Sequence, residues 1–179
     1  MNHRIVLLAA VVACGRGENA PPPPAATVAA PQDTASIDTT AATHRAPPRA
    51  PQATLRAIEA TAQSEYDRVV FEFADGVPGY HVEYLPKTVR CGSGDPVSVQ
   101  GSASLMVRFE PARAHDDQGS PTLTTREGTL GLPALTEWKL ICDFEGQVEF
   151  LLGVTATAPY RMTEQAAPAR LVLEVRHAR

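Results

Sequence analysis

The densest group of side chains that could carry out chemistry is His115-Asp116-Asp117, in a segment rich in turn-forming residues. A histidine beside carboxylates could act as an acid–base pair or bind a divalent cation. The same residues are typical of a loop in which aspartates accept hydrogen bonds from turn amides. We favour the loop, because no other carboxylate group or histidine pair stands at metal-ligand spacing. His115 and Asp116 are kept as candidate ligand-binding residues.

Motifs of common enzyme classes are missing from the sequence. It contains no Gly-x-Ser-x-Gly nucleophile motif. Gly92-Ser93-Gly94 leads to Asp95-Pro96, which turns the chain instead of opening a helix over a phosphate. We therefore predict a non-catalytic protein without cofactor or metal, and keep a hydrolase as a less favoured alternative.

The charge of the chain argues against nucleic acid as a partner. The net charge is −4, and the basic residues are scattered along the sequence. Charged residues such as Arg68, Glu72 and Glu174 stand on the polar side of predicted strands. They could offer a mixed-charge surface to glycan or peptide carboxylates, but an ordinary solvated sheet face is the favoured interpretation.

The N-terminus reads as an export signal. Residues 5–13 form an apolar run after a basic start, too short for a membrane span, which takes about 20 residues. Val11-Val12-Ala13-Cys14 resembles the lipobox of bacterial lipoproteins. The resemblance implies that residues 1–13 are a cleaved signal peptide and that lipid on Cys14 anchors an exported protein to the cell membrane or outer membrane. The alternative is an uncleaved apolar N-terminus with an incidental cysteine.

The chain has three cysteines, and lipid on Cys14 leaves Cys91 and Cys142 as a pair. In an oxidising compartment an even pair predicts a disulfide. Closing a loop of this length stabilises a domain by roughly 4 kcal/mol in the chain-entropy model. The alternative is two free buried thiols.

Residues 14–64 have the composition of a disordered tether. They are dominated by Ala, Pro, Thr and Gln and contain no aromatic residue. Such a segment cannot bury enough apolar surface to offset its conformational entropy. We predict disorder, with a short helix over residues 54–63 as an alternative. The chain then divides into a signal peptide (1–13), a lipid-anchored tether (14–64) and a folded domain (65–179).

From residue 66 onward, apolar and polar residues alternate with the period of a β-strand. The inward sets begin at Val69, Tyr80, Leu105, Trp138, Val148 and Leu171. One-sided alternation is typical of antiparallel sheets with one solvated face. We predict an all-β domain, an antiparallel β-sandwich or flattened barrel of about seven to nine strands.

One hairpin allows a prediction of register. Trp138, Leu140, Cys142 and Phe144 share one parity, and Val148 begins the next apolar set. A three-residue loop over residues 145–147 would place Phe144 opposite Val148. We prefer it to a two-residue turn over residues 145–146, which would place the apolar Phe144 opposite the polar Gln147 on the same face of the sheet. It would also leave Cys142 on the buried face.

Six blocks of the predicted domain combine strand and turn patterns in a fixed order: residues 66–73, 78–84, 143–148, 153–154, 159–161 and 170–177. Taken together, these blocks resemble the AMIN-like domain of bacterial exported proteins and lipoproteins. The resemblance spans residues 65–178 and implies a β-sandwich. Through looser kinship with AMIN domains, which target envelope proteins to peptidoglycan, it suggests a module that binds or scaffolds at the cell wall, in the periplasm or at the cell surface.

Two residues of the block 159–161 are further candidates for ligand binding. Tyr160 could stack on a sugar because the residues around it leave its side undetermined, and Arg161 follows it. An alternative function is a protein-interaction module that docks on an envelope complex through a sheet edge.

Replacing Cys14 with Ala should release the protein from the membrane fraction without unfolding the domain. The reason is that acyl chains contribute about 0.8 kcal/mol per buried CH₂ to membrane binding. Fractionation followed by immunoblotting measures the release, with Thr27→Ala as a control in the same segment. A Cys14→Ala protein that stays with the membrane would contradict the lipoprotein prediction.

Overall fold

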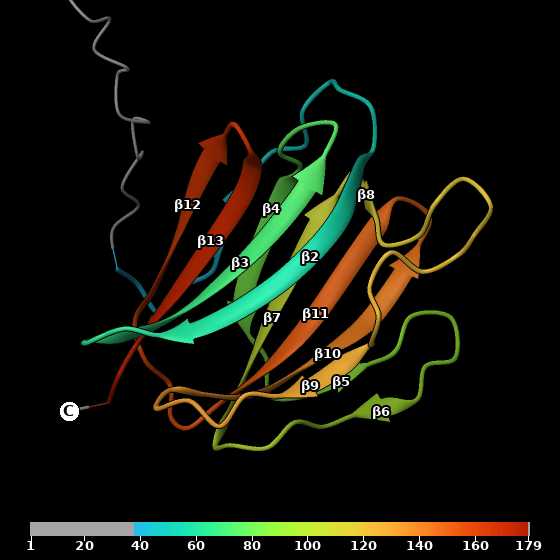
Figure 1. Ribbon diagram of the computed structural model, residues 1–179. Helices are drawn as coiled ribbons and strands as arrows, with labels where there is room; N and C mark the ends of the chain where they lie inside the picture. Colours follow the sequence, from blue (N-terminus) through green and yellow to red (C-terminus); the bar gives the residue numbers. More distant parts are fainter. Residues whose placement is uncertain (1–37, 179) are drawn as a thin grey trace, which may run out of the picture. The chain divides into compact units, whose positions relative to one another are not determined.

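Strands with alternating apolar and polar side chains build two sheets that pack face to face (Figure 1). The computed structural model describes residues 38–178. These residues form thirteen strands. Within this range no helix is long and apolar enough to cross a membrane. The all-β sandwich predicted from the sequence is confirmed.

The six-stranded sheet has the order β1 (Thr43–Arg45), β4 (Gly79–Tyr84), β7 (Ala103–Glu110), β11 (Gln147–Val154), β10 (Leu135–Phe144) and β9 (Glu127–Thr129). The five-stranded sheet has the order β12 (Tyr160–Ala166), β13 (Ala169–Arg176), β3 (Tyr66–Ala74), β2 (Ala53–Ala62) and β8 (Ala112–Arg113). A small hairpin joins β5 (Thr88–Val89) to β6 (Pro96–Val97). The β2–β8 pair is parallel and the other described pairs are antiparallel.

The core lies between the two sheets and contains the side chains that the alternation assigned to it. Phe71 of β3 contacts Phe109 of β7 and Phe150 of β11, with ring centroids 4.8 and 5.2 Å apart. The predicted inward residues that are buried here are Val69, Phe71, Phe73, Val82, Leu105, Val107, Phe109, Trp138, Leu140, Val148, Phe150, Leu152, Val154, Leu171, Leu173 and Val175. Tyr80 and Tyr84 pack partly buried against them.

Strand β2 corrects the prediction of disorder, or of a short helix, before residue 65. A β-bulge between Leu55 and Ala57 lets Leu55 face Phe73 and Ile58 face Phe71. Both side chains pack on the core although they stand three residues apart. A spacing of three residues is typical of a helix. Because the bulge interrupts the alternation of apolar and polar residues, the sequence pattern did not predict a strand here. The domain therefore begins earlier than residue 65, whereas residues 1–37, including Cys14, lie outside the described part.

The β10–β11 hairpin also differs from its prediction. Its turn has two residues, Glu145 and Gly146, with φ of 49° and 83°. Positive φ at both positions is the requirement of a type I′ turn. Phe144 therefore pairs with Gln147 and is 59% exposed, so the three-residue loop was wrong.

The cause is a β-bulge between Leu140 and Cys142, which reverses the parity of the strand end. Leu140 pairs with the core residue Phe150, but Cys142 pairs with Glu149. Directly paired residues share a face, so Cys142 leaves the face of Trp138. It is buried all the same, under a different part of the chain.

Cys142 is bonded to Cys91, with Cα atoms 5.2 Å apart, which confirms the predicted disulfide. Cys91 lies between β5 and β6, and the hairpin of these strands covers the outer face of the six-stranded sheet. Under it lies a second apolar cluster of Met106, Ile141 and Leu151, packed by Leu85, Val97 and Val99. The disulfide fastens this covering hairpin to β10.

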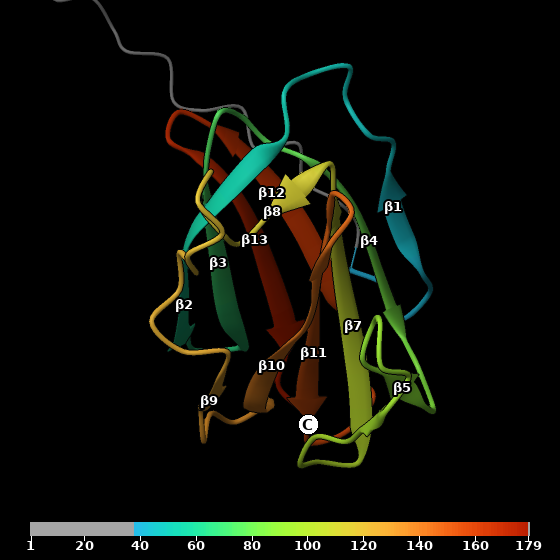
Figure 2. The same ribbon diagram turned by 90° about the vertical axis from the view of Figure 1, so that its right-hand side faces the viewer.

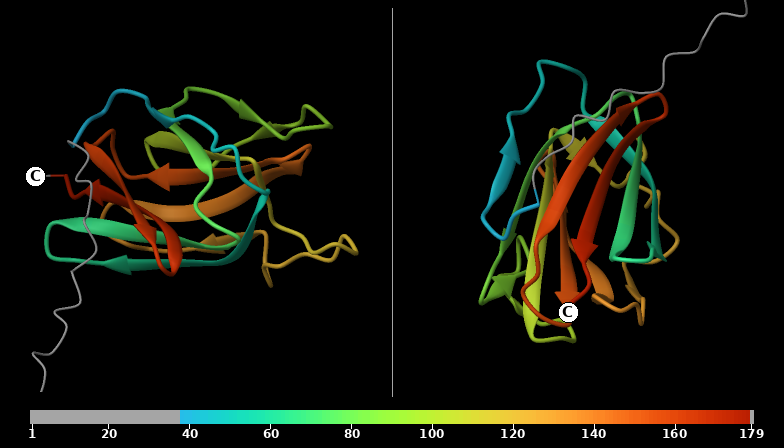
Figure 3. Two further views of the ribbon diagram at one scale, coloured as in Figure 1. Left: turned by 90° about the horizontal axis from the view of Figure 1, so that it is seen from above. Right: turned by 90° about the vertical axis from the view of Figure 1, so that its left-hand side faces the viewer.

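The segment before β2 connects the edges of the two sheets. Thr39 exchanges backbone hydrogen bonds with Tyr160 of β12, while β1 pairs with β4. Arg45 donates to the carbonyl oxygen of Pro78 at 2.8 Å and forms an ion pair with Glu164. In Figure 3 (right), β1 and β2 lie at opposite margins of the sandwich.

Replacing both Cys91 and Cys142 with Ser should lower the free energy of unfolding by about 4 kcal/mol, because the unfolded chain regains the entropy of an open loop of about 50 residues. Urea unfolding measures the difference. Reductant should shift the wild-type midpoint to that of the variant and leave the variant unchanged. Equal midpoints with and without the disulfide would contradict this account.

Candidate functional site

Three neighbouring strands of the five-stranded sheet place a row of charges on its outer face. Glu174 of β13 pairs with Arg68 of β3 on one side and with Arg161 of β12 on the other. Arg68 Nη2 donates to Glu174 Oε1 at 2.6 Å, and Arg161 Nε donates to Glu174 Oε2. One carboxylate therefore lies between two guanidinium groups, and its side chain is only 6% exposed.

The two arginines keep Glu174 ionised. Burial acts to raise the pKa of Glu174, but hydrogen bonds from Arg68 and Arg161, together with their charges, outweigh burial and lower it. Both guanidinium groups also lie near the ring of Tyr66, 5.5 and 5.4 Å from its centroid. A carboxylate and an aromatic ring thus hold both arginines in place.

A second charged row lies further along the same strands. Arg170 of β13 pairs with Glu72 of β3, and their side chains form an ion pair of 2.6 Å. Both side chains are more than a third exposed. Gln165 of β12 is the neighbour of Arg170 on the other side, and Thr163 lies between the two rows.

The two rows border a groove of about 420 Å³, which we call the arginine groove. Its lining residues are Arg68, Val70, Arg161, Thr163, Gln165, Arg170, Val172 and Glu174. The three arginines of the groove face two carboxylates, Glu174 and the Glu72 partner of Arg170, which leaves one positive charge in surplus in a chain of net charge −4. The side chains of Thr163 and Gln165 form no hydrogen bond with another residue of 38–178. The groove can therefore accept carboxylates together with hydroxyl and amide groups.

Tyr160, predicted as a ligand-binding residue beside Arg161, is fully buried instead. Its ring packs against Tyr84, and its hydroxyl lies 2.7 Å from the carbonyl oxygen of Ala41 and 2.8 Å from that of Val82. Burial raises the pKa of Tyr160. Neighbouring strand residues point to opposite faces, so one of this pair had to face inward. Tyr160 cannot offer a sugar-stacking surface in this conformation.

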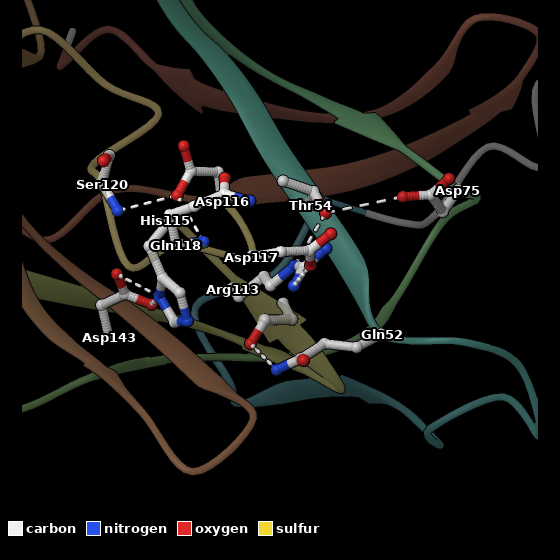
Figure 4. Close-up of polar contacts among 11 residues, drawn as sticks. Gln52, Thr54, Asp75, Arg113, His115, Asp116, Asp117, Gln118, Ser120 and Asp143 are labelled. Carbon is white, nitrogen blue, oxygen red and sulfur yellow. Dashed lines mark hydrogen bonds and ion pairs between the residues drawn. The ribbon is translucent and has the colours of Figure 1, made fainter.

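His115 is not among the lining residues of the groove; it fastens the loop that follows β8 (Figure 4). Its Nδ1 is 3.0 Å from both carboxylate oxygens of Asp143, at the end of β10. Asp143 also accepts a hydrogen bond from the backbone of Ala114 at 2.9 Å. The bulge in β10 is what turns Asp143 toward this loop. Within residues 38–178, no three His, Cys, Asp or Glu side chains are grouped to hold a metal ion.

Asp116 caps the turn that follows, as the loop interpretation expected. Its Oδ1 accepts hydrogen bonds from the backbone of Gln118 and Ser120, at 2.9 and 2.8 Å (Figure 4). Arg113 links the base of the loop to Thr54 of β2 at 3.0 Å. The carboxylate and guanidinium groups of this cluster are therefore engaged in holding the chain.

The arginine groove draws on residues that the sequence analysis had treated as a solvated face. Arg68 and Glu174 are 106 positions apart, and only the pairing of β3 with β13 brings them together. The sequence signal was the alternation that places both outside. Which outward residues become neighbours depends on the strand order, and the alternation carries no information about that order.

The chain is thus an antiparallel β-sandwich with a charged groove on the outer face of one sheet. The model of the AMIN-like domain family matches residues 53–177, and the chain belongs to this family. AMIN-like domains are non-catalytic modules of the bacterial cell envelope. The match begins at the first residue of β2. No curated protein and no solved structure matches the chain.

Replacing Glu174 with Gln should make the stability less sensitive to acid. A lowered pKa in the folded state contributes stability that is present above the ordinary pKa of 4.5 and is lost as the pH falls through the lowered value. The free energy of unfolding of the wild type should therefore fall more steeply below about pH 5 than that of Glu174→Gln. Glu59→Gln, at an exposed position of β2, should keep the wild-type slope. Parallel slopes for all three proteins would contradict a role for the Arg68–Glu174–Arg161 row.

Proposed function

We propose that this domain binds peptidoglycan, and that the arginine groove is the surface that does so. Peptidoglycan is a polymer of amino sugars cross-linked by short peptides that carry carboxylates. A carboxylate accepts paired hydrogen bonds from a guanidinium group. The positive surplus of the groove is the single observation that carries the proposal.

The spacing of the groups suits a polymer better than an isolated ion. Arg170 is partly exposed and has a single carboxylate partner, Glu72, so an arriving carboxylate can share or replace that contact. Thr163 and Gln165 stand beside it with hydroxyl and amide groups for peptide and sugar oxygens. Arg68 and Arg161, held by Glu174 and Tyr66, border the other end. Fixed side chains bind with less loss of conformational entropy than free ones.

The rest of the chain supports delivery to the cell wall. We propose that lipid on Cys14 anchors the protein in the envelope and that the segment before the domain sets its distance from the membrane. Membership of an envelope family and the disulfide of an oxidising compartment both support this placement. The bound state would be a scaffold, with the lipid on one side and the polymer on the other.

Sedimentation with purified sacculi tests the proposal, using the full chain with Cys14→Ala to prevent acylation. The protein should pellet with sacculi at low salt and be released as salt screens the charges. Arg170→Gln should weaken retention about tenfold, because one charge-assisted hydrogen bond of about 1.5 kcal/mol is lost. This variant leaves unpaired only Glu72, whose side chain is more than a third exposed, so the fold should be retained.

Arg49→Gln is the matched control, since it removes one exposed arginine outside the groove. If the wild type fails to pellet at low salt, the peptidoglycan proposal is wrong. If Arg170→Gln and Arg49→Gln pellet equally well, wall binding stands but the groove is not its surface. Crosslinking in membranes that recovers one dominant protein partner would instead favour docking on an envelope complex through a sheet edge.

A further inference from the structure

A second, smaller pocket lies at the margin of the sandwich, away from the arginine groove. The segment between β8 and β9 runs down beside β2 at this margin (Figure 2). The pocket has a volume of about 180 Å³. Its lining residues are Arg56, Ile58, Thr122, Leu123, Thr124, Thr125 and Trp138. It therefore combines apolar side chains from both sheets with three hydroxyl groups and one guanidinium group.

The indole of Trp138 forms one wall of this pocket. Its ring packs against Phe150 of the core at 5.7 Å between centroids, and the residue is 8% exposed. Gly128 of β9 pairs with Trp138, and a Cβ at Gly128 would lie 2.7 Å from the indole Nε1. Glycine at this position thus leaves room for the ring. This wall is formed by the only tryptophan of the chain.

The polar groups of the pocket lack partners within residues 38–178. The hydroxyl of Thr122 is buried and forms no hydrogen bond, although the backbone of Thr122 is fixed by a bond to the carbonyl oxygen of Ala114. A buried hydroxyl without a partner is costly, and native structures keep few of them. Arg56 is exposed and forms no ion pair with a described residue. A contact between this buried hydroxyl and a ligand would require the Thr122 side chain to rotate, a movement that breaks no hydrogen bond.

We propose that this pocket binds the acetamido group of an N-acetylated amino sugar. The methyl group would pack against Ile58, Leu123 and the indole, while the amide would bond to the Thr122 hydroxyl and to Arg56. Pockets that enclose whole drug-sized ligands measure about 300–1,000 Å³. A pocket of about 180 Å³ therefore suits one substituent with the edge of one sugar ring. The inference deepens the proposed function, because the glycan strands of peptidoglycan carry such groups.

Fluorescence of the single tryptophan reports directly on this pocket. The full chain with Cys14→Ala should be titrated with an oligomer of N-acetylglucosamine and with the glucosamine oligomer of equal length. The acetylated oligomer should give a saturable change in emission. The deacetylated oligomer should bind at least about tenfold more weakly, because it leaves the apolar wall and the hydroxyl unpaired. Equal affinities, or no saturable change with the acetylated oligomer, would overturn the proposal.

Thr122→Val separates binding from folding. The substitution keeps the shape of the side chain and removes an unpaired buried hydroxyl, so the unfolding midpoint should stay equal or rise. Affinity for the acetylated oligomer should nevertheless fall about tenfold. Thr129→Val, on β9 but outside the lining, should change neither quantity. Unchanged affinity in Thr122→Val would exclude the assigned role of Thr122 and overturn the proposal.

The two proposals fail in different ways. If sacculi retain the wild type but not Arg170→Gln, while the acetylated oligomer leaves the fluorescence unchanged, the groove stands and the pocket is wrong. If the oligomer binds to wild type and Arg170→Gln alike while sacculi retain neither, the pocket stands and the groove is wrong.

Discussion

The contact of Phe71 with Phe109 and Phe150 is the interaction on which the rest of the structure depends. It joins the two sheets at the centre of the core and fixes which side of each strand faces inward. Because side chains alternate along a strand, packing Phe71 inward places Glu72 outward on β3. The arginine groove is thus the outer counterpart of the core. A change of register by one residue would remove both together.

β-Bulges in β2 and β10 adapt this regular pattern to local needs. The bulge in β2 lets Leu55 and Ile58 both reach the core although an even alternation would separate them. The bulge in β10 turns Asp143 toward His115 and Cys142 toward Cys91. One extra residue in β10 therefore has two consequences. Asp143 holds the loop that contains His115, and Cys142 holds the β5–β6 hairpin. Bulges concentrate where a side chain has to be redirected.

The two proposed binding surfaces use different physics. The arginine groove offers charge at the solvent-exposed face of a sheet, where salt screens it and each contact contributes modestly. The pocket beside Trp138 offers shape and unpaired hydrogen-bonding groups at the margin between the sheets. A long polymer can occupy both, and several weak contacts then add to stable binding. Such a division suits a module that attaches to a wall and performs no reaction on it.

The sequence alone determined the all-β class, the inward residues of the long strands, the disulfide and the capping role of Asp116. Each depends on neighbours within one strand or turn, or on the number of cysteines. Tertiary structure alone decided that Arg68, Arg161 and Glu174 form one row, that Tyr160 is buried and that Arg56 shares a pocket with Trp138. These facts depend on strand order and on bulges. Strand order is set by contacts between residues far apart in the chain, and a bulge shifts the alternation on which sequence-based prediction relies.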